Sequence, residues 1–196
     1  LTALFCRRNF DMSHFIVGIT GASGTIYASR LLLHLKNLGH RVSVVFSDAA
    51  EQVAAFEKQE KAFVLADEIL EINDFFSFAA SGSASFKGMA ILPCSMGTLG
   101  KLASGITDNL LVRAADVCLK EKRALVLVPR EMPLHAIHLE NMLKLSKTGA
   151  TIIPAAPHFY TNPETIEDLV DTVVAKVLTH LGVENSIVPS WGSSCD

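Results

Sequence analysis

The sequence lacks any long hydrophobic run. Its apolar stretches all fall short of the roughly 18–20 residues that a membrane-spanning helix needs, so we expect no membrane partner. Surplus positive charge is also missing, because 17 Lys and Arg stand against 20 Asp and Glu, for a net charge of −3. Nucleic-acid binding depends on clustered cations, so we expect no nucleic-acid partner either.

Cysteine is scarce, and no Cys-x-x-Cys pair occurs. Four widely separated thiols argue against a disulfide framework and against a zinc site, and they favour a reducing, cytoplasmic environment. The four are Cys6, Cys94, Cys118 and Cys195. His135 and His138 lie three residues apart with Glu140 nearby, but the spacing gives no third ligand of a typical open metal site, so we expect no metal.

The remaining composition is that of one globular domain. The 196 residues are 49% hydrophobic and 19% charged, which suits a single core. We predict an N-terminal extension over residues 1–13, because Met12 and Ser13 resemble a natural start. We expect the domain itself over residues 14–182 and a C-terminal tail over residues 183–196, which contains Trp191.

Short apolar segments alternate with helical patterns along the chain. This alternation predicts an α/β fold with three layers, a Rossmann-like or flavodoxin-like parallel sheet with helices on both faces. Ligands of such sheets bind at the carboxyl ends of the strands, where the strand order reverses. The predicted strands are residues 14–20, 41–47, 89–92, 124–128 and 150–153. The predicted helices are residues 26–38, 49–56, 62–72, 97–122, 134–147 and 164–181, the last capped by Thr161 or Asn162.

A glycine-rich turn follows the first predicted strand. Residues 20–24 read Thr-Gly-Ala-Ser-Gly, and glycines there allow close approach of a ligand to a helix N-terminus. A short-chain dehydrogenase can open in the same way, but that family needs a Tyr-x-x-x-Lys pair. Tyr27 and Tyr160 are followed four residues on by Leu31 and Glu164, which disfavours a dehydrogenase.

A second hydroxyl-rich turn, residues 93–98, follows the strand at 89–92. Its serine and threonine could simply cap the next helix. Two such turns in one domain nevertheless suit a ligand with several polar ends, such as FMN.

Charged residues gather after two later elements. Arg113, Asp116 and Lys120 share one predicted helical face, which is ordinarily a solvated face with an Arg–Asp pair. Arg130 and Glu131 follow the next strand directly, and we expect them to face the same end of the sheet as that helical face.

Together these segments, with His138-Leu139-Glu140-Asn141-Met142 and residues 154–157 running into Phe159-Tyr160, resemble the UbiX/Pad flavin prenyltransferases. The resemblance covers about residues 14–192. It implies FMN as the cofactor, dimethylallyl phosphate as the prenyl donor, and prenylated FMN as a product handed to a UbiD-type decarboxylase. It also implies a homo-oligomer, a dodecamer, with pockets at subunit contacts.

The resemblance assigns roles to individual residues. It implies FMN contacts at Gly21, Ala22, Ser23, Ser47, Ser95, Met96, Gly97, Thr98 and Arg130. It implies contacts to the donor at Arg113, Lys120, Arg130, Tyr160 and Lys176. Catalytic roles fall to Ser23, Glu57, Lys120 and Glu131, of which Ser23 and Glu57 are candidates for handling the N5 proton.

Two alternatives stay open at this point. One is an FMN-dependent cysteine decarboxylase of the related fold, although such proteins typically carry Pro-x-Ser-Ala-Asn-Thr where this chain has Met96-Gly97. The other is a non-catalytic FMN carrier. The chain has no Asp-Asp pair of the kind that holds Mg²⁺ in diphosphate prenyltransferases, which is consistent with a metal-independent reaction.

Overall fold

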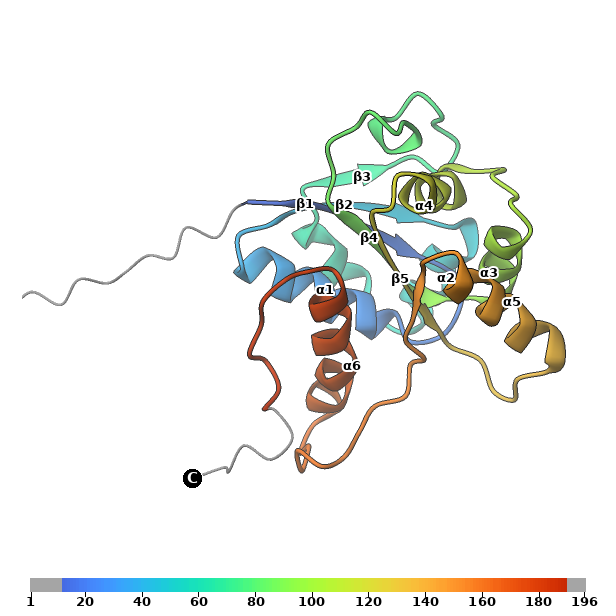
Figure 1. Ribbon diagram of the computed structural model, residues 1–196. Helices are drawn as coiled ribbons and strands as arrows, with labels where there is room; N and C mark the ends of the chain where they lie inside the picture. Colours follow the sequence, from blue (N-terminus) through green and yellow to red (C-terminus); the bar gives the residue numbers. More distant parts are fainter. Residues whose placement is uncertain (1–11, 190–196) are drawn as a thin grey trace, which may run out of the picture.

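The computed structural model describes residues 12–189 (Figure 1). Most of the predicted N-terminal extension, the end of the tail, and Cys6, Trp191 and Cys195 lie outside the described residues.

A six-stranded parallel sheet forms the centre of the molecule (Figure 1). Its strands lie in the order β3-β2-β1-β4-β5-β6, so the order reverses between β1 and β4. That reversal creates a crevice at the carboxyl ends of β1 and β4, where a ligand can enter. The strands are β1 (His14–Ile19), β2 (Arg41–Phe46), β3 (Glu68–Leu70), β4 (Gly88–Cys94), β5 (Ala124–Pro129) and β6 (Thr151–Ile152).

Helices cover both faces of the sheet. Side chains alternate along β1, so that Phe15 and Val17 enter one core while Ile16 enters the other. The first core packs under α1 (Thr25–Asn37), α2 (Asp48–Phe56) and α6 (Ile166–His180). The second packs under α3 (Met96–Ala103), α4 (Leu110–Lys120) and α5 (Ala136–Lys147). The predicted three-layer α/β fold is therefore confirmed.

The helix predicted over residues 62–72 is wrong. The chain instead forms the 3-10 helix η1 (Glu60–Leu65) and then the short edge strand β3, which pairs with β2. The carboxylate of Asp67 accepts a 2.8 Å hydrogen bond from the backbone N–H of Val42 and so anchors the start of β3. Three residues are too few to show the period of a strand, so tertiary pairing decides this segment.

The prediction of a single helix over residues 97–122 is wrong, because this segment forms two helices, α3 and α4. Gly105 has φ of +71°, which a helix interior does not accept, and Asn109 then caps α4 by accepting a hydrogen bond from the N–H of Val112. The predicted cap of α6 is also wrong. Thr165 rather than Thr161 or Asn162 caps that helix, in a reciprocal capping box with Asp168.

The strand predicted to end at Leu92, before Pro93, ends two residues later, because β4 continues to Cys94. A second 3-10 helix, η2 (Phe78–Ala80), lies in the loop before β4.

Cys94 and Cys118 are free and buried, and burial raises the pKa of each thiol to about 12. Within residues 12–189, no helix has both the length and the apolar character needed to span a membrane.

Candidate active site

The two predicted turns meet at the reversal of strand order. The hydroxyl of Thr20, which is fully buried, donates a 2.8 Å hydrogen bond to the carbonyl of Pro93 and accepts a 2.7 Å bond from the N–H of Ser95. Because one side chain satisfies backbone groups of both turns, the β1–α1 turn and the β4–α3 turn are held as one unit.

Glycines let the backbone of the β1–α1 turn lie close to its neighbours. A Cβ on Gly21 would meet the Cβ of Ala49 at 2.5 Å, so only glycine fits there without a shift. Gly24 has φ of +104°, in the left-handed region that favours glycine. Ala22 is buried beneath the turn, and Ser23 between them is exposed.

Glu57 reaches the N-terminus of α1 from the end of α2. Its carboxylate accepts hydrogen bonds from the N–H groups of Gly24 at 2.9 Å and Thr25 at 2.8 Å, and from the Thr25 hydroxyl. Burial alone would raise the pKa of Glu57, but hydrogen bonds from Ser23, Thr25 and these N–H groups lower it. Glu57 is therefore held as a carboxylate, which can accept a proton but has none to donate.

The β4–α3 turn includes a helix cap. The Ser95 hydroxyl accepts a hydrogen bond from the N–H of Thr98 and lies 3.1 Å from the Thr98 hydroxyl. The capping role that the sequence allowed for Ser95 is thus present. Met96 is half-buried and Gly97 is exposed, and a Cβ on Gly97 would meet nothing within 4 Å, so this first turn of α3 is open to a ligand.

Ser47 supplies an unpaired polar atom beside these turns. Its N–H donates to the carbonyl of Ile19, whereas its buried Oγ has no hydrogen-bond partner. A cavity of about 270 Å³ lies against it, between the ends of β2 and β3. A buried hydroxyl without a partner at the carboxyl edge, next to the β1–α1 turn, fits the polar ribityl hydroxyls of FMN.

Arg130 crosses from the end of β5 to the first turn. Its Nε donates a 3.2 Å hydrogen bond to the carbonyl of Ser23, which places a cation beside the predicted FMN contacts. The neighbouring Glu131 is exposed, and its carboxylate accepts a hydrogen bond from the N–H of Met132.

Tyr160 and Lys176 line a second cavity, of about 230 Å³, together with His158. The loop before α6 carries Tyr160, while Lys176 projects from α6. The structure therefore brings together two of the residues predicted to bind the donor.

Arg113 and Lys120 lie elsewhere in the chain. Arg113 bonds the carbonyl of Ala80 and pairs with Asp116 at 3.0 Å. Lys120 precedes β5, whereas Arg130 follows it, and a six-residue strand spans about 20 Å. Lys120 therefore lies near the amino end of β5 and Arg130 at its carboxyl end. The prediction that they face the same end of the sheet is wrong for two residues of the same chain.

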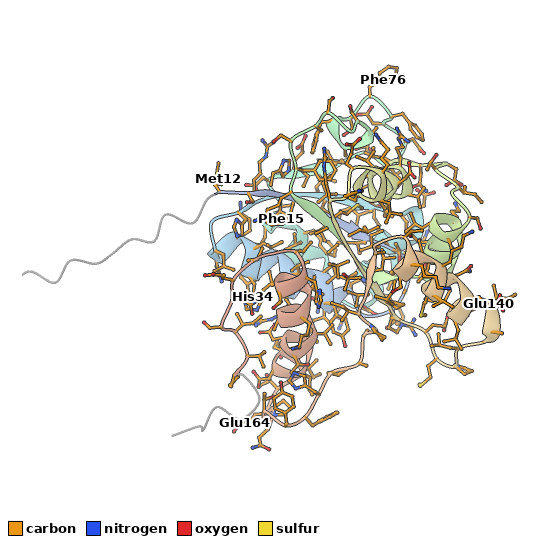
Figure 2. All side chains as sticks on the ribbon, in the orientation of Figure 1. Met12, Phe15, His34, Phe76, Glu140 and Glu164 are labelled. Atoms are coloured by element: carbon orange, nitrogen blue, oxygen red, sulfur yellow. The ribbon has the colours of Figure 1, made fainter. Side chains whose placement is uncertain are left out.

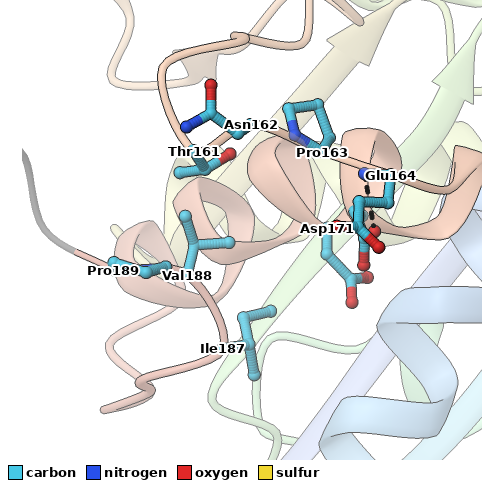
Figure 3. Close-up of a pocket in the computed structure, with 9 residues that line it drawn as sticks. Thr161, Asn162, Pro163, Glu164, Asp171, Ile187, Val188 and Pro189 are labelled. Carbon is cyan, nitrogen blue, oxygen red and sulfur yellow. Dashed lines mark hydrogen bonds between the residues drawn. The ribbon is translucent and has the colours of Figure 1, made fainter. Parts of the chain in front are cut away.

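A third cavity, of about 290 Å³, lies between the start of α6 and the tail (Figure 3). Glu164, Asp168 and Asp171 line it, so its negative charge is unsuited to a phosphate. Across the part of the chain that the structure describes, no group of three His, Cys, Asp or Glu side chains is placed to hold a metal ion.

The sequence did not identify Thr20, Thr25 or His158 as part of the site. Thr20 is the first residue of the glycine-rich turn at residues 20–24, and its position directly after β1 is a sequence signal that points to the site. Thr25 could not be identified, because its partner Glu57 lies 32 residues away. His158 has no sequence pattern of its own.

Comparisons with known proteins identify the family of the chain. The family model for Flavoprotein matches residues 6–178. A flavin prenyltransferase UbiX from Halalkalibacterium halodurans is 47% identical over 93% of this chain and 95% of the relative.

Two solved structures are also similar. A structure of AnUbiX (PadA1) with FMN and dimethylallyl pyrophosphate has a TM-score of 0.89 and 38% identity, over 93% of this chain and 99% of that one. A dodecameric FMN-dependent UbiX-like decarboxylase from Escherichia coli O157:H7 has a TM-score of 0.87 and 42% identity, over 92% and 100%. The chain therefore belongs to the UbiX flavin prenyltransferase family of flavoproteins.

Proposed function

We propose that this protein transfers a dimethylallyl group from dimethylallyl phosphate to N5 and C6 of reduced FMN, and that a UbiD-type decarboxylase uses the product. The observation that carries the proposal is the junction of the two turns through Thr20, with the orphaned Ser47 hydroxyl beside it. Bound FMN would supply the electron-rich positions that form the new bonds.

Cations and a hydroxyl would stabilise the leaving phosphate. When the allylic C–O bond breaks, its electron pair leaves with the phosphate, and fixed donors are most effective against charge that develops there. Tyr160 and Lys176 already share a cavity, and Arg130 lies beside the FMN turn. Lys176 is a point charge without a bidentate fork, so it binds an anion without fixing its orientation.

Acidic and hydroxyl groups would handle the protons. Glu57 is held ionised at the N-terminus of α1, so it can accept a proton that the Ser23 hydroxyl passes from N5. Glu131 lies next to Arg130 in the chain and would orient the cations that contact phosphate.

We further propose that the complete site draws on two subunits of a homo-oligomer. Lys120 is separated from Arg130 by the length of β5, so a neighbouring chain would bring Arg113 and Lys120 to the carboxyl edge. Dodecameric assembly of the Escherichia coli relative supports this arrangement.

Two exposed apolar groups suit such a contact. One lies on and before α5, where Met132, Ile137 and Leu143 are exposed, and the other is Phe75 and Phe76, which are exposed before η2. Figure 2 shows Phe76 pointing away from the body of the molecule.

The test is anaerobic incubation of the protein with reduced FMN and dimethylallyl phosphate, followed by the mass and spectrum of the flavin. We expect the flavin to gain one dimethylallyl unit. An unchanged flavin mass with bound FMN would favour the non-catalytic carrier, and loss of CO₂ from a cysteine-containing peptide would favour the decarboxylase.

A further inference from the structure

His158 lines the proposed donor-phosphate cavity together with Tyr160 and Lys176. Its backbone N–H donates a 3.3 Å hydrogen bond to the hydroxyl of Thr172, and that hydroxyl donates to the carbonyl of Leu169. Thr172 is buried on α6, so this bond attaches the loop at His158 to a rigid helix.

The ring of His158 stacks on the ring of Tyr160. Their centroids are 4.0 Å apart and their planes differ by only 9°. Tyr160 is 41% exposed and belongs to a loop, and this stacking restrains one face of its phenol ring.

Lys176 follows Thr172 by one helical turn and therefore shares its face of α6. His158, Tyr160 and Lys176 all line the cavity of about 230 Å³. Burial, and secondarily the charge of Lys176, lowers the pKa of His158, so at neutral pH its ring is uncharged and does not repel that ammonium group.

We propose that His158 is a positioning residue, which holds Tyr160 by ring stacking so that the phenol hydroxyl and Lys176 bind one phosphate group together. This inference rests on the proposed function for the identity of the donor, but the anion site itself does not depend on prenyl transfer. A hydroxyl stabilises an anion best when its orientation is fixed beforehand, and the Thr172–His158–Tyr160 chain of contacts supplies that restraint.

The first test compares His158→Ala, His158→Phe and the control His180→Ala, an exposed histidine on the same helix as Lys176. Calorimetric titration with inorganic phosphate gives a Kd, and steady-state assays give KM for dimethylallyl phosphate and kcat separately. We expect His158→Ala to raise both the phosphate Kd and the donor KM by about three- to tenfold, the range of an aromatic pair, with a smaller change in kcat. His158→Phe keeps a stacking ring and should restore both values, and His180→Ala should match wild type.

The second test asks whether His158 acts through Tyr160. In a Tyr160→Ala background, His158→Ala should cause no further loss of phosphate binding. Wild-type phosphate binding by His158→Ala, or equal weakening in the Ala and Phe variants, would overturn the proposal. If His158→Ala does not fold, His158→Gln, which also lacks an aromatic ring, takes its place with the same expected result. If His158→Ala weakens phosphate binding but the wild-type protein transfers no prenyl group, the proposed function is wrong and the positioning role of His158 still holds.

Discussion

The backbone N–H of Ser95 donates a 2.7 Å hydrogen bond to the hydroxyl of Thr20. Thr20 ends the β1 side of the crevice and Ser95 ends the β4 side, so one buried hydroxyl sets the spacing of the two turns. FMN binding at the reversal of strand order should therefore depend on a residue that need not touch the flavin.

Replacing Thr20 by Val should weaken both the fold and FMN binding. The change keeps the shape of the side chain but leaves the Ser95 N–H short of a partner, which costs about 1–3 kcal/mol for a buried group. The Pro93 carbonyl loses the hydroxyl as a donor and keeps only the backbone N–H of residue 20. Denaturant unfolding and FMN fluorescence titration measure the two effects. Thr20→Ser retains the hydroxyl and should remain close to wild type; a stable Thr20→Val with normal FMN affinity would contradict this role.

Replacing Ser47 by Ala should separate binding from stability. The Ser47 Oγ is buried without a partner, so its removal should leave the unfolding free energy unchanged or slightly higher. FMN affinity should fall by about two- to twelvefold through loss of one hydrogen bond. Ser95→Ala is the matched comparison, because Ser95 also caps α3 and its loss should lower stability by about 0.5–2 kcal/mol. Unchanged FMN affinity in Ser47→Ala would remove Ser47 from the site.

Glu57→Gln should lower stability in a pH-dependent way. The pKa of Glu57 in the folded protein is below its ordinary value of 4.5, so the ionised group stabilises the fold above that pH. We expect the wild type to exceed the variant by about 0.5–2 kcal/mol at pH 7, as for a lost helix cap. The difference should shrink as the pH falls below about 4.5 and through the lowered pKa. A difference that stays constant between pH 7 and pH 3 would show that the carboxylate is not the stabilising form.

Asp171 joins α6 to α1 through Arg30 and His34. The side chain of Asp171 is 11% exposed, and its carboxylate lies 3.0 Å from the His34 ring and forms a two-point contact with Arg30. Burial would raise its pKa, but these hydrogen bonds bring the pKa below the ordinary value, so its contribution is present above about pH 3.8 and lost in stronger acid.

We expect Asp171→Asn to lower the unfolding free energy by about 1.5–3 kcal/mol, the range of a hydrogen bond to a charged group. Asp108→Asn, which breaks an exposed pair with Lys101, should cost less than about 1 kcal/mol. Equal effects of the two variants in denaturant unfolding at pH 7 would contradict the assigned importance of the Asp171 contact.

The sequence predicted the sheet and its glycine turns because both leave local signals. Residues 15–19 and 124–128 are continuous runs without a polar side chain, and the turn at residues 20–24 follows one of them directly. The short strand β3 has no such signal, since three residues cannot show a period, and only pairing with β2 reveals it.

The site was predictable only where function lies in a contiguous motif. Glu57 binds α1 through residues more than 30 positions away, so its capping role needs the folded chain. Helical spacing predicts that Arg113 and Lys120 share one face of a helix. The position of that face relative to Arg130 depends on the direction in which α4 returns to β5, and helical spacing does not show that direction.

The most direct test of the proposed site uses two variants that damage different parts of it, Lys120→Ala and Arg130→Ala. Each is incubated anaerobically with reduced FMN and dimethylallyl phosphate, alone and after the two chains are dissociated, mixed and reassembled, and the flavin mass is then measured. If one site combines Arg130 of one chain with Lys120 of another, some mixed contacts carry both intact residues. We then predict prenylated flavin from the mixture and little from either variant alone. Prenylated flavin at wild-type yield from each single variant, or none from the mixture when wild type that was dissociated and reassembled in the same way is active, would contradict the account.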